Sequence, residues 1–107
     1  MLLMTPEGKK VVVSLKEDAE LYDAPRNPPD TGTNYTSGTD MYSHKARSGK
    51  VYFYSYLWSM WQGTEESYTL KTEEEAKQFI LERAGIAGHV HGGIDFERCR
   101  EIWPDIF

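Results

Sequence analysis

The strongest pattern in the chain is the run of aromatic and apolar residues at 51–58, Val-Tyr-Phe-Tyr-Ser-Tyr-Leu-Trp. Aromatic and β-branched side chains favour strands, so this run predicts a β-strand. Met41 to Arg47 leads into Ser48-Gly49, which suits a two-residue hairpin loop. Residues 67–71 alternate between polar and apolar positions and predict a third strand. Together these segments predict a three-stranded antiparallel meander over residues 41–71.

Two shorter strands are predicted near the N-terminus, at Leu2–Met4 and at 10–13. Thr5-Pro6-Glu7-Gly8 between them fits a type I turn, with proline at its second position and glycine at its fourth. Two interpretations fit residues 14–22. Ser14-Leu15-Lys16-Glu17 has the pattern of a capping box and predicts a short helix. A strand through Leu21 and Tyr22 is nearly as well supported.

The clearest helix signal is Thr72-Glu73-Glu74-Glu75, which is also a capping box. Three acidic residues in the first turn favour the positive end of the helix dipole. The pattern predicts a helix over residues 73–84, ended by Gly85. Its predicted apolar face consists of Ala76, Phe79, Ile80 and Ala84.

A shorter C-terminal helix is expected to begin at Asp95 and to end at Pro104, with Phe96, Cys99 and Trp103 pointing inward. Residues 24–40 are rich in Pro, Gly, Asn, Ser and Thr and predict a long polar loop. The order of elements predicts an α+β fold: a small antiparallel sheet of about five short strands, with both helices packed on one face. The length of 107 residues fits a single domain spanning 1–107.

Charge is distributed unevenly along the chain. Residues 1–63 carry seven basic and seven acidic residues, so the net charge of −5 arises entirely in residues 64–107. An acidic chain is not expected to coat DNA through charge alone. The single cysteine, Cys99, excludes an internal disulfide and suggests a reducing compartment, so we expect a cytoplasmic protein. No apolar run approaches the roughly 20 residues of a membrane helix, and we expect no membrane contact.

The hairpin allows a more specific prediction about faces. If Ser48-Gly49 is the loop, Arg47 lies opposite Lys50, and alternation sorts the side chains onto two faces. One face carries Tyr42, His44, Ala46, Val51, Phe53, Ser55 and Leu57. The other carries Met41, Ser43, Lys45, Arg47, Lys50, Tyr52, Tyr54, Tyr56 and Trp58. The first is the better core face, because Val51, Phe53 and Leu57 can pack under the main helix. A one-residue slip of register would mix the two sets.

The second face suggests a binding surface. We name as the aromatic–basic face the residues Lys45, Arg47, Lys50, Tyr52, Tyr54, Tyr56 and Trp58. Tyr, Trp and Arg are enriched at protein interfaces, so the first hypothesis is a non-catalytic module that binds a protein, with a second copy of the chain as one candidate. The alternative is a module for single-stranded nucleic acid or RNA loops, with bases stacked on the rings and phosphates held by the cations. A third interpretation is purely structural, with the N-terminal hairpin or a second copy covering the face.

Metal and catalytic sites are weakly supported by the sequence. His89-Val90-His91, Asp95 and Cys99 could supply ligands, but their spacing does not match a structural zinc site, so we expect no metal and no cofactor. Cys99 is expected to be inert in an apolar environment. An enzyme would need a cleft that joins His44 and Asp40, with His89 or His91 as a further candidate.

Residues 41–84 have a definite order of elements: three antiparallel strands, a capping Thr72 and a helix beginning Glu-Glu-Glu-Ala76. This order resembles the arm-type DNA-binding domains of tyrosine integrases and the AP2 domains. The resemblance implies a sheet that approaches a DNA groove. It is confined to the order of elements, and no base-contacting motif carries over.

Overall fold

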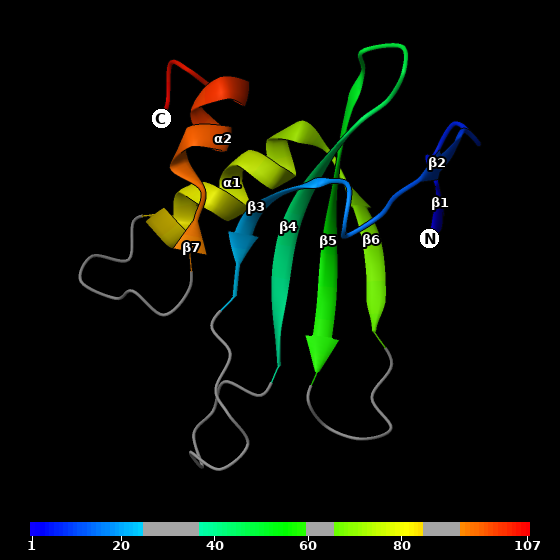
Figure 1. The fold of residues 1–107 in the computed structure, drawn as a ribbon, viewed down its shortest axis with the longest axis horizontal. Coiled ribbons are helices and arrows are strands. Elements are labelled where there is room, and N and C mark those ends of the chain that lie inside the picture. The colour runs from blue at the N-terminus through cyan, green and yellow to red at the C-terminus, as the bar shows by residue number, and fades with distance from the viewer. Residues whose placement is uncertain (25–36, 60–65, 85–92) are drawn as a thin grey trace.

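The structure is a computed structural model that describes residues 1–24, 37–59, 66–84 and 93–107 (Figure 1). The elements in chain order are β1 (Leu2–Met4), β2 (Lys10–Val12), β3 (Ala19–Asp23), β4 (Ser37–Lys45), β5 (Val51–Ser59), β6 (Ser67–Lys71), α1 (Glu73–Ala84), β7 (Gly93–Ile94) and α2 (Phe96–Ile102). No helix in these ranges is long and apolar enough to cross a membrane.

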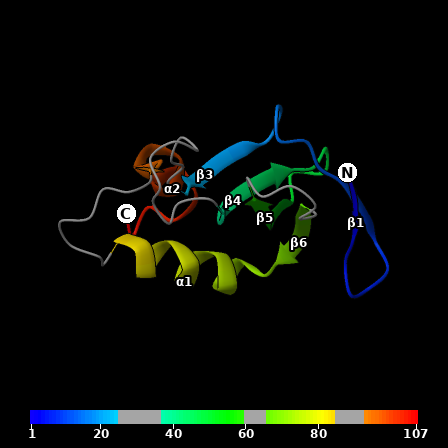
Figure 2. The same cartoon turned by 90° about the horizontal axis from the view of Figure 1, so that it is seen from below.

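The five-stranded antiparallel sheet has the order β6-β5-β4-β3-β7, and β1 and β2 form a separate two-stranded ribbon. β3 to β6 follow one another as neighbours, whereas β7 lies at the opposite edge from β6. The chain between them includes α1, which therefore crosses one face of the sheet (Figure 2). This arrangement confirms the predicted α+β class, with one main helix and one short C-terminal helix.

The strand alternative holds for the ambiguous segment at 14–22. The chain makes one turn from Ser14, whose carbonyl accepts the Asp18 amide at 2.8 Å. The Asp18 carboxylate in return accepts the Ser14 amide at 2.8 Å. The turn does not propagate into a helix, because the chain continues as β3, which pairs with β4 and buries Leu21 completely.

The predicted polar loop at 24–40 is shorter than expected. β4 begins at Ser37 and pairs with β5 from Ser37↔Ser59 onward, so residues 37–40 belong to the sheet. Residues 25–36 lie outside the described ranges. Polar composition suggested a loop, but long-range pairing with β5 determines the structure of residues 37–40.

Both predicted helices are confirmed. The Thr72 amide donates to Glu75 Oε1 at 2.9 Å and the Glu75 amide to Thr72 Oγ1 at 3.1 Å, which completes the capping box of α1. Asp95 caps α2 through the Arg98 amide at 3.1 Å. Cys99 and Trp103 are buried as predicted. Phe96 is not, because the first residue of α2 points outward and its ring contacts Phe107 instead.

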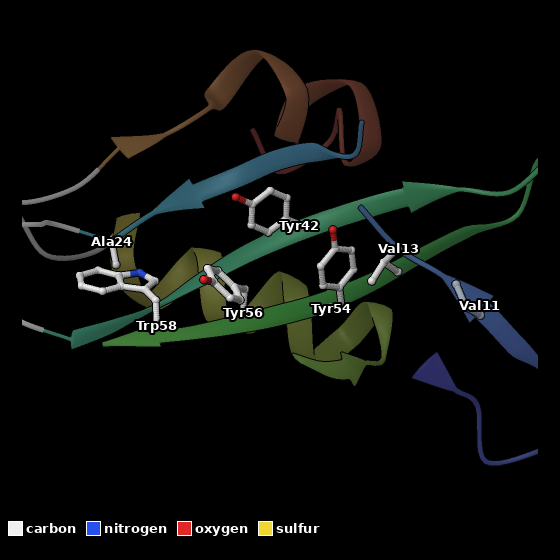
Figure 3. Packing of buried hydrophobic residues seen from close by; sticks show 7 residues of the cluster. All are labelled: Val11, Val13, Ala24, Tyr42, Tyr54, Tyr56 and Trp58. Carbon is white, nitrogen blue, oxygen red and sulfur yellow. The ribbon is translucent and has the colours of Figure 1, made fainter. Parts of the chain in front are cut away.

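A separate apolar cluster lies on each face of the main sheet. On the helical face, Leu21, Met41, Phe53, Ala76, Ile80, Cys99 and Trp103 are buried together. On the other face the cluster contains Val11, Val13, Ala24, Tyr42, Tyr54, Tyr56 and Trp58 (Figure 3). Phe53 packs as predicted, but Val51 and Leu57 are exposed, because α1 and α2 do not extend over both ends of the nine-residue β5.

Candidate functional site

The predicted register of the β4–β5 hairpin is wrong by one residue. Ala46 and Lys50 are bonded through the Ala46 amide at 2.8 Å, and Lys45 pairs with Val51. The loop therefore has three residues and contains Gly49 at φ +91°, a conformation that glycine adopts at little cost. The longer loop moves β4 by one position against β5, so the two predicted sets of side chains are mixed.

The register change separates the members of the aromatic–basic face. Lys45 lies opposite Val51, on the face that carries Phe53 and the helices. Arg47 and Lys50 are exposed residues of the hairpin loop region, outside both strands. Lys50 contacts one ring of the set, with its Nζ 5.1 Å from the centre of Tyr52. The cations therefore do not frame the tyrosine row as predicted.

Most of the aromatic row is inaccessible. Tyr54 has 0% exposure, Tyr56 and Trp58 are buried, and Tyr52 is half-buried. Figure 3 shows Val13 of the N-terminal segment beside Tyr54 and Ala24 beside Trp58. A ring that is already packed inside the chain cannot stack on a base. This finding favours the structural interpretation for Tyr54, Tyr56 and Trp58, while a binding role for the exposed cations stays a prediction.

Buried carboxylates hold this aromatic cluster together. Asp40 is fully buried, and its Oδ1 accepts the Ala24 amide at 2.8 Å and the Trp58 indole N–H at 3.0 Å. Asp18 Oδ2 accepts the Tyr54 hydroxyl at 2.8 Å. Neither role was predicted from the sequence. The available signal was that buried Tyr and Trp need polar partners, which acids on the same face of adjacent strands can supply.

The described residues do not test the prediction that the chain binds no metal. Carboxylate oxygens of Glu20, Asp23 and Asp40 lie within 4.8 Å of one another, and these residues take part in hydrogen bonds or other polar contacts within the chain. His89 and His91 lie outside the described residues. Cys99 is buried in the helical core, where burial raises the pKa of its thiol to about 11. A thiol that stays protonated at neutral pH is a poor nucleophile and metal ligand.

The enzyme interpretation required a cleft that joins His44 and Asp40, but the groove that His44 lines contains Asp18 instead. His44 Nδ1 lies 2.8 Å from Asp18 Oδ1, not near Asp40, and both residues line an open groove of about 1020 Å³. Lys45 and Lys50 line this groove together with Glu17 and Glu101. The mixed charges of these side chains favour no single class of substrate. An imidazole oriented by a carboxylate is also a common structural pair, and here Asp18 simultaneously fastens Tyr54.

Among the residues that the structure describes, three of the four most exposed large apolar side chains lie on the N-terminal ribbon formed by β1 and β2. Leu2 is 53% exposed, Met4 59% and Val12 66%. Leu2 pairs with Val12 and Met4 with Lys10, so these four side chains share the outward face of the ribbon. Leu3 and Val11 occupy the inward face and pack against the aromatic cluster. Figures 1 and 2 place the ribbon at the opposite end of the molecule from α2.

The backbone of β2 presents an unpaired edge beside this apolar face. Met1 and Val13 exchange hydrogen bonds in both directions, at 2.8 and 3.1 Å. Because bonded and non-bonded pairs alternate in antiparallel ladders, the amide and carbonyl groups of Lys10 and Val12 point away from β1. Within the described ranges these groups have no hydrogen-bond partner. This hairpin lies where the sequence predicted it, but its unpaired edge was not predicted.

Comparison with known proteins finds no matching protein family, no matching curated protein and no matching solved structure.

Proposed function

We propose that this chain is a non-catalytic interaction module that binds a protein partner by strand addition at the β2 edge. The observation that carries the proposal is the backbone of Lys10 and Val12, which is unpaired among the described residues and lies next to a Val12 side chain that is 66% exposed. Strand addition at an exposed edge is a recurring mode of peptide recognition. Backbone hydrogen bonds give affinity, and the alternating side chains give specificity.

The side chains around the edge support an extended apolar partner. Leu2 and Val12 form a directly opposed pair without mutual hydrogen bonds, the closer of the two antiparallel pair types. Their side chains make a continuous apolar strip on the outward face. A partner strand added beside β2 would place every second side chain on the face that carries Val12 and would remove part of this strip from water.

The edge is also restricted in what it accepts. β2 has three residues, and Lys10 projects from its outward face. Short edge strands and lysines are devices by which proteins limit indiscriminate strand pairing. The partner must therefore match a short register and must place no cation opposite Lys10, which favours a specific protein over generic aggregation.

Nucleic-acid binding has weaker support. The stacking hypothesis required accessible rings, and Tyr54, Tyr56 and Trp58 are packed inside the chain. The exposed cations Lys45, Arg47 and Lys50 remain, without an accessible aromatic row between them.

Site-specific photo-crosslinking tests the proposed function. A benzophenone amino acid replaces Val12 in one sample and the exposed Glu82 of α1 in the control. We expect discrete protein adducts from position 12, absent from position 82 and reduced when Leu2→Gln is added. A position 12 that yields no more adduct than position 82 overturns protein binding at this edge.

A further inference from the structure

We infer that the partner strand is β2 of a second copy of this chain, paired antiparallel about a two-fold axis that passes beside Val11. This inference rests on the proposed function and names the partner. The two ribbons would then form one continuous sheet, with each copy contributing β1 and β2.

Symmetry favours this occupant. A strand can pair with an identical strand in an antiparallel sense about a two-fold axis, and such an interface is closed, because each copy uses the same patch. Such pairing requires that the edge of β2 is accessible to a second copy. β1 lies between the main sheet and β2, so the unpaired amide and carbonyl groups of β2 point away from both. When the strand is reversed about Val11, Lys10 of each copy lies opposite Val12 of the other.

Three registers of the β2–β2 pair are possible, centred on Lys10, on Val12 or on Val11, and the first two are unfavourable. Pairing Lys10 with Lys10 of the partner opposes like charges, which is destabilising. Pairing Val12 with Val12 of the partner would bring Lys10 opposite Ser14, whose amide already donates to Asp18 at 2.8 Å. Centring the pair on Val11 places Lys10 opposite Val12 in both directions, so all free amide and carbonyl groups of the two residues are used.

The same register matches side chains on both faces. The inward faces bring Val11 of the two copies together, next to Leu3, and this row continues the aromatic cluster of each copy. On the outward face the aliphatic stem of Lys10 lies against Val12 of the partner, with the ammonium group in water. Isolated two-stranded ribbons are marginal in water, so enlarging the sheet stabilises the ribbon itself.

Sedimentation equilibrium tests the edge. Val12→Pro deletes the outward amide and keeps an apolar side chain, while the β1–β2 ladder does not use that amide. Val12→Thr is the matched control, because it keeps the amide and the β-branched shape. We expect the chain to dimerise, Val12→Thr to retain the dimer, and Val12→Pro to weaken association by roughly tenfold or more. A monomeric chain, or a Val12→Pro variant that dimerises like the parent, overturns the inference.

Cysteine substitution tests the register with folded protein. In the proposed dimer only position 11 lies opposite itself, at a separation that suits a disulfide. We expect Val11→Cys to form a covalent dimer under mild oxidation, although the side chain is buried in the monomer, and the buried Cys99 to form none. A Val11→Cys chain that stays uncrosslinked while Val12→Cys crosslinks contradicts this register.

The two proposals fail in different ways. Photo-adducts from position 12 with other proteins, together with a monomeric chain, overturn the second copy as partner and leave strand addition in place. No adduct at position 12 and no dimer overturn both.

Discussion

Tyr54 best represents how single residues hold the sheet together. Its ring is fully buried between the strands and the N-terminal segment. The ring stacks on that of Tyr42, with 5.4 Å between the ring centres, and the Tyr54 hydroxyl donates to Asp18 at 2.8 Å. Truncating a core aromatic residue to alanine costs about 3–5 kcal/mol, so we expect Tyr54→Ala to lower the free energy of unfolding by about that amount. Tyr54→Phe keeps the ring and loses one hydrogen bond to a carboxylate, about 1.5–3 kcal/mol. Urea denaturation measures both, and a change below about 1 kcal/mol for Tyr54→Ala would contradict the burial of this ring.

The same residue gives a prediction about pH. Burial, followed by the hydrogen bond to Asp18, raises the pKa of Tyr54 far above its usual value. An unfolded tyrosine loses its proton near pH ~10, whereas the folded residue keeps it. The stabilisation is therefore complete below pH ~10 and decreases above it, by up to about 1.4 kcal/mol per pH unit. Denaturation at pH 9 to 11 should show the Tyr54→Phe variant losing less stability than the parent. Equal losses of stability in the two proteins would contradict a contribution from the raised pKa of Tyr54.

At the scale of elements, local signals were sufficient for the helices but not for the strand register. Thr72 and Glu75 satisfy each other within one turn, so the start of α1 could be predicted from adjacent residues. The β4–β5 register depends on whether the loop contains two or three residues, and Ser48-Gly49 suits both. That single choice determined which side chains share a face with Tyr54. The free edge of β2 could not be predicted either, because it depends on what lies beside the strand in space.

The close approach of Ala24 and the Trp58 ring to Gly38 of β4 is testable. A Cβ atom at position 38 would lie 2.8 Å from the Ala24 Cβ and 2.8 Å from Trp58 Cζ2. The Trp58 ring is buried and its indole N–H is bonded to Asp40, so it cannot move aside freely. We expect Gly38→Ala to destabilise the fold by about 1–3 kcal/mol, as overpacking does. Gly93→Ala on β7, where the new methyl group meets nothing within 4 Å, is the control for thermal unfolding. Equal melting temperatures for the two variants would contradict the close packing at Gly38.

At the scale of the whole molecule, the two faces of the sheet have different roles. The helical face is covered by α1 and α2. The aromatic face is covered in part by Val11 of the N-terminal ribbon and by Val13, which directly follows it. The ribbon therefore has a structural inward side and an outward side that is exposed at Leu2, Met4 and Val12. The sequence predicted the α+β class, but it did not predict that Tyr54, Tyr56 and Trp58 are buried, because their burial depends on contacts with residues far away in the chain.

Residue-resolved amide hydrogen exchange at low and high protein concentration tests the central claim most directly. The Val11 amide faces β1 and should be protected at both concentrations. The account predicts that the Lys10 and Val12 amides exchange rapidly in dilute protein and become protected at high concentration, when the second copy of β2 occupies the edge. Lys10 and Val12 amides that exchange rapidly at every concentration would contradict it.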